Sequence, residues 1–181
     1  MNTSSAGIRN LLFDLGGVII NLDRQRCVDA LTALGDEKAD EMLSLSVQRG
    51  TLMDLEEGKI SPSDFFKRMR QKIGKAVSDE EIVHALNELL IGIPLDRLTL
   101  LRKLRQRFNV MMLSNTNPIM FDTKIAECFA QEGLSITDYF DDVYLSYRLK
   151  SCKPDIAIFK KVIDPVSFRK RLYFSMTLKR I

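Results

Sequence analysis

Short apolar runs alternate along this chain with longer segments of helical spacing. Ile8–Phe13 and Val110–Leu113 are almost continuously apolar, which is typical of strands buried on both faces of a parallel sheet. Asp142–Ser146 has the length of a third short strand. Helical spacing marks three further segments: Leu95–Arg107, Ile119–Gln131 and Ile156–Ile163. This alternation predicts an α/β fold with right-handed crossovers and a parallel sheet.

The span between the first two predicted strands carries helix signals and few strand signals. Ser61-Pro62-Ser63-Asp64 combines an N-cap, a proline at the first helical position and an acid three residues after the cap. Ser78-Asp79-Glu80-Glu81 is a capping box that leads into Ile82–Leu90, which is apolar at helical spacing. We interpret residues 23–93 as a small helical insertion in an α/β domain.

Composition and cysteine spacing limit the classes of protein to which this chain can belong. The chain is 45% hydrophobic and 28% charged, an ordinary globular balance, and it has no apolar run long enough to cross a bilayer. Cys27, Cys128 and Cys152 form no CxxC pair and are typical of reduced thiols. The first ten residues lack the pattern of a secretory signal. We therefore expect a cytoplasmic protein without a membrane partner.

The net charge of +3 comes from the C-terminal residues. Residues 167–181 hold five basic residues and no acid, which leaves 22 basic against 24 acidic residues in 1–166. A nucleic-acid surface would need basic residues on the body of the domain. We therefore expect no nucleic-acid partner.

Polar residues follow each predicted strand. Asp14 follows the first, Ser114 and Asn115 the second, and Lys153 the third. Each alone has a plain structural explanation as a cap, a turn or a solvated side chain. Because ligands of parallel sheets bind at the carboxyl ends of the strands, we expect these residues to meet at one edge.

Their chemistry suits phosphoryl transfer. The Asp14 carboxylate can attack phosphorus and form an aspartyl-phosphate, which divides hydrolysis into two easier steps. The Ser114 hydroxyl, the Asn115 amide and nearby backbone N–H groups can hold phosphoryl oxygens, and Lys153 can stabilise both anions. Mg²⁺, which takes oxygen ligands, can bridge carboxylate and phosphate. Gly16-Gly17 lets the backbone turn tightly beside the ligand.

These residues resemble the motifs of the haloacid dehalogenase superfamily of hydrolases. Phe13-Asp14-Leu15-Gly16-Gly17-Val18 is similar to its first motif, Leu113-Ser114-Asn115-Thr116 to its second and Lys153-Pro154 to its third. The resemblance covers Ile8–Ile163, with the helical insertion where the family carries its type-1 cap. Leu145-Ser146 before Lys153-Pro154 resembles the bacterial sugar-phosphate branch that includes glucose-1-phosphate phosphatases.

The resemblance implies a Rossmann-like core at 1–22 and 94–181, incomplete at its C-terminal end, and a helical cap at 23–93 that closes over substrate. It implies that Asp14 is the nucleophile, that Ser114, Asn115 and Lys153 bind the phosphate, and that Mg²⁺ binds the Asp14 carboxylate and the Gly16 carbonyl. The expected partner is a small phosphorylated metabolite, such as a sugar phosphate.

Two departures from the family pattern bear on activity. Most phosphatases of the family carry a general-acid Asp where this chain has Gly16, and such a group is typically worth about 10²–10⁴-fold in rate. The fourth motif, an apolar strand ending in Asp-Asp, should follow Ile163, but no acid follows Asp164. Codons for Arg169–Ile181, shifted by one base, can encode such a strand, so we hypothesise a frameshifted C-terminus. Arg169–Leu178 itself gives only weak support for a substitute strand.

Two alternatives from other classes stay open at this point. The departures favour a non-catalytic or truncated member of the family, which would bind Mg²⁺ or phosphate without turnover. A haloacid dehalogenase would use the same Asp14 attack on a carbon–halogen bond without a metal. The phosphatase remains the leading hypothesis because of the resemblance to the sugar-phosphate branch.

Overall fold

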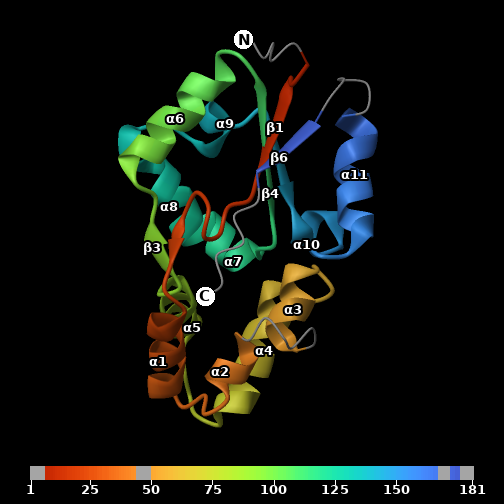
Figure 1. Ribbon diagram of the computed structural model, residues 1–181. Helices are drawn as coiled ribbons and strands as arrows, with labels where there is room; N and C mark the ends of the chain where they lie inside the picture. Colours follow the sequence, from red (N-terminus) through yellow and green to blue (C-terminus); the bar gives the residue numbers. More distant parts are fainter. Residues whose placement is uncertain (1–6, 44–49, 167–171, 176–181) are drawn as a thin grey trace.

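A four-stranded parallel sheet forms the centre of the upper part of the molecule (Figure 1). The computed structural model describes residues 7–43, 50–166 and 172–175. The strand order is β5-β4-β1-β6, with the following bounds: β1 Asn10–Phe13, β4 Asn109–Ser114, β5 Asp142–Leu145 and β6 Leu172–Ser175. Phe13 pairs with Met112 on one side and with Ser175 on the other, so the carboxyl ends of the strands share one edge.

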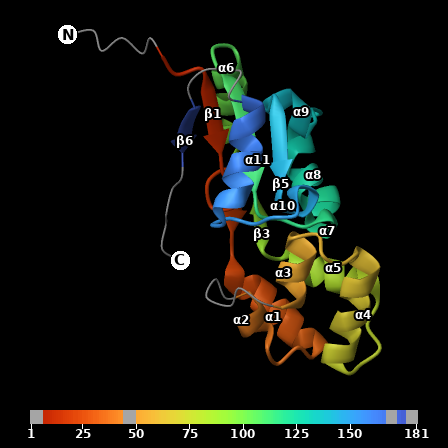
Figure 2. The ribbon, with the colours of Figure 1, turned by 90° about the vertical axis from the view of Figure 1, so that its right-hand side faces the viewer.

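Helices cover both faces of this sheet (Figures 1 and 2). One layer contains α6 (Leu95–Arg105), α8 (Ala126–Phe129) and α9 (Ile136–Tyr139), and the other contains α10 (Ser146–Leu149) and α11 (Ile156–Val166). The predicted segment 119–131 is helical but divided: α7 Pro118–Met120, a π-helix Phe121–Ile125, α8 and a 3₁₀ turn Ala130–Glu132.

The continuous apolar pattern of β4 results from these two layers. Met111 and Leu113 pack with Ile158 and Val162 of α11, whereas Met112 belongs to the larger core on the other face. Successive side chains of a strand point to opposite faces, so a strand covered on both sides needs an apolar residue at every position. The predicted α/β fold with a parallel sheet is confirmed.

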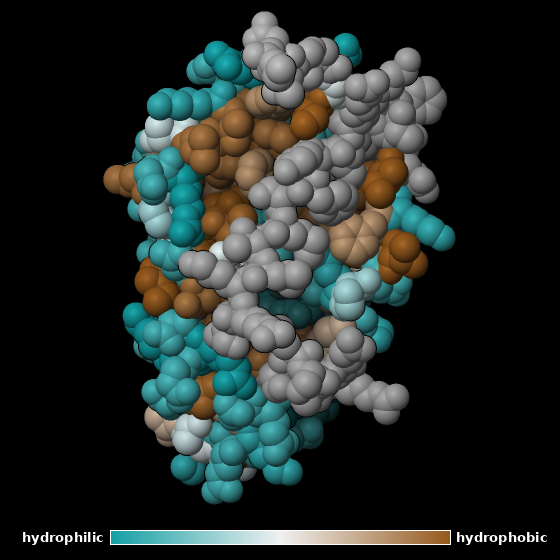
Figure 3. Space-filling model, in the orientation of Figure 1, coloured by the Kyte–Doolittle hydropathy of each residue, from teal (hydrophilic) through white to brown (hydrophobic). Residues whose placement is uncertain are grey.

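In the described residues between 23 and 89 the chain forms five helices, which lie below the carboxyl edge of the sheet in Figure 1. They are α1 Arg24–Leu34, α2 Ala39–Met42, α3 Thr51–Glu56, α4 Pro62–Ile73 and α5 Asp79–Asn87. Ser61 and Ser78 cap the two predicted helix starts, and each forms a capping box with side-chain and backbone bonds in both directions. On the face shown in Figure 3, the surface of these helices is mostly hydrophilic, whereas apolar residues gather over the sheet and α6.

A short antiparallel pair joins this helical segment to the sheet region. β2 (Asn21–Leu22) pairs with β3 (Leu90–Gly92), so the chain enters and leaves the segment side by side. The sequence predicted that the last helix here would run to Leu90, but α5 ends at Asn87. Apolar spacing alone does not distinguish a helix end from a short buried strand, and pairing with β2 decided the outcome.

The strand β6 was only weakly supported by its sequence, yet it pairs in parallel with β1. The edge of β1 opposite β4 presents N–H and C=O groups that need partners. An extended backbone of almost any sequence can provide these hydrogen bonds. The side-chain pattern of Leu172–Ser175 therefore did not predict the strand. Residues 167–171 and 176–181 lie outside the described residues, and the frameshift hypothesis stays a prediction.

The three cysteines are free and buried. Burial raises the pKa of the Cys27 thiol to about 12 and that of Cys152 to about 11, so both thiols stay protonated and unreactive near neutral pH. Within the described ranges, no helix is both long and apolar enough to cross a membrane.

The helical segment depends on a phenylalanine in its core, and this gives a first prediction. Phe65 of α4 is fully buried, while the adjacent Phe66 is only partly buried and contacts it edge-on at 6.0 Å between ring centroids. We expect Phe65→Ala to lower the free energy of unfolding by about 3–5 kcal/mol and Phe66→Ala by clearly less. Urea denaturation measures both. Equal losses would contradict this packing.

Candidate active site

Asp14 is the first residue after β1 and lies at the carboxyl edge of the sheet. The Leu15 N–H donates a 2.7 Å hydrogen bond to Asp14 Oδ1. The chain then turns back tightly, with the Ile19 and Ile20 N–H groups both donating to the Leu15 carbonyl. Gly17 takes a φ of 72° in this turn, a conformation that glycine adopts without steric cost. The turn therefore fixes the orientation of the Asp14 carboxylate.

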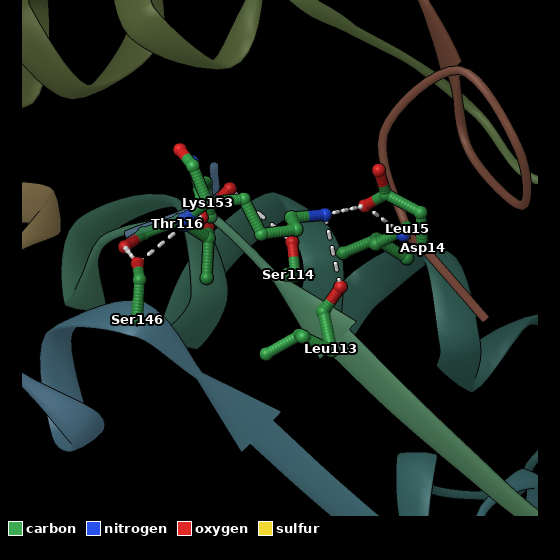
Figure 4. A network of polar contacts seen from close by, with 8 residues as sticks. Asp14, Leu15, Leu113, Ser114, Thr116, Ser146 and Lys153 are labelled. Carbon is green, nitrogen blue, oxygen red and sulfur yellow. Dashed lines mark hydrogen bonds and ion pairs between the residues drawn. The ribbon is translucent and has the colours of Figure 1, made fainter. Parts of the chain in front are cut away.

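Lys153 contacts Asp14 directly. Its Nζ lies 2.6 Å from Asp14 Oδ1 and donates to the Leu113 carbonyl at 3.1 Å (Figure 4). The two side chains are 13% and 26% exposed, so solvent screens this pair less than a surface ion pair. The other oxygen of Asp14, Oδ2, points away from Lys153 in Figure 4.

Asn115 holds the Lys153 backbone rather than facing a ligand with its side chain. Its Nδ2 donates to the Lys153 carbonyl at 2.9 Å, and its Oδ1 accepts from the Lys153 N–H at 2.8 Å. Both ends of the amide are thus bonded to one residue 38 positions away. The side chain that we expected to hold phosphate therefore positions Lys153.

Ser114 is the last residue of β4 and is 2% exposed. Its hydroxyl donates a 3.2 Å bond to the Asn115 carbonyl, a weak contact that a better acceptor can replace. Asp14, Ser114 and Lys153 lie close together at the carboxyl edge of the sheet (Figure 4), and Asn115 is bonded to the Lys153 backbone.

Ser146 is a residue of this site that the sequence reasoning did not select. Its hydroxyl accepts from the Thr116 N–H and donates to the Thr116 carbonyl, both at 3.0 Å (Figure 4). These bonds tie the start of α10 to the loop after β4. Ser146 comes directly after β5, much as Ser114 ends β4, and this place at the end of a strand was the signal that could have identified it.

The family model for haloacid dehalogenase-like hydrolases matches residues 8–170. The chain belongs to this family. A relative, D-ribitol-5-phosphate phosphatase of Bacteroides thetaiotaomicron, is 37% identical over 156 residues, which cover 86% of this chain and 76% of the relative. The predictions of the family and of a phosphohydrolase are confirmed. The finer resemblance to glucose-1-phosphate phosphatases stays a prediction.

Solved structures of the haloacid dehalogenase family give the same result. A Bacteroides thetaiotaomicron enzyme of the family, crystallised as a mutant with magnesium and inorganic phosphate, superposes with a TM-score of 0.88 at 39% identity, covering 93% of this chain and 84% of that one. A Porphyromonas gingivalis hydrolase of the family has a TM-score of 0.84 at 32% identity, covering 92% and 80%.

The oxygens near Asp14 fit a magnesium ion of the kind that keeps several waters. In the described part of the chain no three His, Cys, Asp or Glu side chains cluster as a metal site. Mg²⁺, however, is commonly held by one or two carboxylates together with substrate phosphate. Asp14 offers one carboxylate, and the hydrogen bonds of the turn use the Leu15 and Ile20 carbonyls rather than that of Gly16. These two groups are compatible with the predicted ligand pair.

Little free space surrounds Gly16, the position where most phosphatases of the family carry a general acid. A Cβ at Gly16 would lie 3.2 Å from Leu22 Cδ1, a contact that a small shift of the leucine methyl would relieve. The backbone of Gly16 is not in the left-handed region. The chain therefore has no side chain near Asp14 at this position to move a proton, although the backbone would permit one.

Proposed function

We propose that this chain hydrolyses small phosphate esters, with phosphorylated polyols or sugars as the substrate class, through an aspartyl-phosphate at Asp14. The contact between the Asp14 carboxylate and the Lys153 ammonium at the carboxyl edge of the sheet carries the proposal. A carboxylate is useful against an anionic ester where positive charge lies beside it. The sugar-alcohol phosphate in the name of one relative supports the substrate class.

The two carboxylate oxygens of Asp14 would have different roles in the reaction. Asp14 Oδ1 is held by the Leu15 N–H and by Lys153 Nζ, so Oδ2 attacks phosphorus and the ester P–O bond breaks. Water then attacks the phosphoryl group on Asp14 and releases inorganic phosphate and the free carboxylate. Splitting the reaction in this way is the general advantage of covalent catalysis.

The phosphoryl oxygens would be bound by the Ser114 hydroxyl, the backbone N–H of Asn115 and the Lys153 ammonium. Asn115 contributes further by holding the Lys153 backbone through its amide. Mg²⁺, held by the Asp14 carboxylate and the Gly16 carbonyl, would neutralise charge on the phosphate. Residues 23–93 would act as a cap over a core formed by 1–22 and 94–181, so that closure excludes water and selects the substrate.

Removal of divalent cations tests this proposal and gives a second prediction. We expect phosphate release from p-nitrophenyl phosphate to fall by at least about 10²-fold in EDTA and to return when Mg²⁺ is added in excess. The same preparation should release no chloride from 2-chloropropionate. Chloride release that resists EDTA would favour a dehalogenase instead. Magnesium-dependent thermal stabilisation without any turnover would favour a non-catalytic member.

A comparison of two substrates tests which class of phosphate ester the enzyme prefers. Phosphate release from D-ribitol 5-phosphate and from glucose 1-phosphate, measured under the same conditions, separates a polyol-phosphate enzyme from the glucose-1-phosphate branch. A linear polyol presents a chain of hydroxyls to the cap, whereas glucose 1-phosphate presents a ring at the leaving oxygen. We expect a higher kcat/KM for the polyol phosphate.

A further inference from the structure

The Ser146 hydroxyl holds both backbone groups of Thr116. β4 and β5 pair in parallel as far as Ser114 and Leu145, so the Thr116 N–H and carbonyl lie beyond the ladder and need other partners. Ser146 Oγ accepts from that N–H and donates to that carbonyl, both at 3.0 Å (Figure 4). Ser146 is fully buried and its one hydroxyl hydrogen is used in this way. It therefore acts on a ligand only through its neighbours.

The same hydroxyl contacts the residue that precedes Lys153. Burial raises the pKa of the Cys152 thiol, and a hydrogen bond with the Ser146 side chain opposes this rise. Cys152 is buried directly before Lys153, and Thr116 is buried directly after Asn115. One hydroxyl therefore joins the neighbours of two residues of the active site, which come from the loops after two different strands.

The bonds of Asn115 to Lys153 complete this connection in the opposite direction. The Asn115 amide binds the Lys153 carbonyl at 2.9 Å and the Lys153 N–H at 2.8 Å. A side chain of the loop after β4 thus holds backbone of the loop after β5, and Ser146 does the reverse at Thr116. We call these two pairs, Ser146–Thr116 and Asn115–Lys153, the loop clasp. The clasp fixes the backbone from which the Lys153 ammonium reaches Asp14 Oδ1 at 2.6 Å.

We infer that Ser146 is a positioning residue for catalysis, which sets the place of the Lys153 ammonium through the loop clasp. The inference rests on the proposed function. Without the hydroxyl, the two backbone groups of Thr116 lose their partner, and the loop after β4 has to shift to satisfy them. A misplacement of about 1 Å at a catalytic group can cost on the order of 10²-fold in rate. The shifted ammonium no longer lies where negative charge develops as Asp14 attacks phosphorus.

Replacement of Ser146 in two backgrounds tests whether this residue acts through Lys153. In the otherwise wild-type protein we expect Ser146→Ala to lower kcat/KM for p-nitrophenyl phosphate by about 10-fold. In Lys153→Met no ammonium remains to be positioned, so the added Ser146→Ala should change kcat/KM by less than about twofold. A residue that only supports the fold would lower both rates by the same factor. Equal losses in the two backgrounds, or no loss in either, would overturn the inference.

Ser151→Ala is the matched control. Ser151 is a second buried serine of the same segment, but its hydroxyl has no hydrogen-bond partner among the described residues. Its removal therefore breaks no bond of the loop clasp, and we expect Ser151→Ala to keep the wild-type kcat/KM. A loss in Ser151→Ala as large as that in Ser146→Ala would mean that any change in this segment lowers the rate, and the inference would fail.

Ser146→Cys keeps the test decisive if Ser146→Ala does not fold. Cysteine is close to serine in shape, but its thiol forms only weak hydrogen bonds. We expect a smaller loss of kcat/KM than in Ser146→Ala, and this loss should again disappear in the Lys153→Met background. A loss that is absent, or that is equal in both backgrounds, would overturn the inference. Absence of p-nitrophenyl phosphate hydrolysis in the wild-type protein with Mg²⁺ would instead refute the proposed function itself, so the two failures are distinct.

Discussion

Replacement of Asp14 by Asn is expected to lower kcat/KM for p-nitrophenyl phosphate by about 10⁴-fold or more. The amide keeps the size of the side chain, and its oxygen can still accept from the Leu15 N–H, but it cannot attack phosphorus as an anion. The charge that Lys153 contacts at 2.6 Å in the wild-type protein also disappears. Release of p-nitrophenolate, followed with Mg²⁺ present, measures the loss.

Two further measurements make this test specific to the nucleophile. Acid-quenched wild-type protein incubated with substrate should carry phosphate on Asp14 by mass spectrometry, and Asp14→Asn should carry none. Asp23→Asn serves as the control, because Asp23 caps α1 through the Arg26 N–H and asparagine caps a helix equally well. A phosphorylated residue other than Asp14, or comparable activity in Asp14→Asn, would refute the proposed mechanism.

Replacement of Lys153 by Met is expected to lower kcat/KM by about 10²–10³-fold. The methionine retains the apolar stem but removes the cation that contacts both Asp14 Oδ1 and the Leu113 carbonyl. The attacking carboxylate and the phosphate then repel each other without that compensating charge. Steady-state rates over a range of Mg²⁺ concentrations measure the effect, and excess Mg²⁺ should restore little of it.

Two further variants, Lys153→Arg and Lys161→Met, provide the comparisons for Lys153→Met. Lys153→Arg should recover only part of the rate, because a planar guanidinium does not occupy the position of a compact ammonium. Lys161→Met is the matched control, since Lys161 Nζ likewise donates to a backbone carbonyl, that of Leu149, but belongs to the outer helix α11. A rate in Lys153→Met within a few fold of that in Lys161→Met would mean that Lys153 has no electrostatic role.

The local pattern of the chain was sufficient to predict β1, β4 and β5, several of the longer helices, and their order. Runs without polar residues, such as Val110–Leu113, are typical of strands covered on both faces, and β4 is covered on both. Ser61 and Ser78 predicted two helix starts correctly because a capping box is satisfied within a single turn of chain. Such features depend on neighbours in sequence, so no knowledge of the fold was needed.

The juxtaposition of Asp14 and Lys153 was also predictable, for a topological reason. Parallel strands place their carboxyl ends at one edge, so residues that follow different strands meet there even when they are far apart in the chain. The ion pair between Asp14 and Lys153 is of this kind. The geometry of each side chain was not predictable in this way. The amide of Asn115 was expected to face phosphate, but it binds the Lys153 backbone.

The sequence by itself determined the strand and helix periods, the α/β class and the edge at which the polar residues gather, because each follows from short-range pattern and sheet topology. Only the tertiary structure decided that Leu172–Ser175 pairs with β1, that Asn115 holds the Lys153 backbone, and that Gly58 lies against the backbone of α10. Each of these features arises when distant segments pack together and the remaining backbone groups and charges find partners. Contacts between distant segments are not encoded in any local pattern of the sequence.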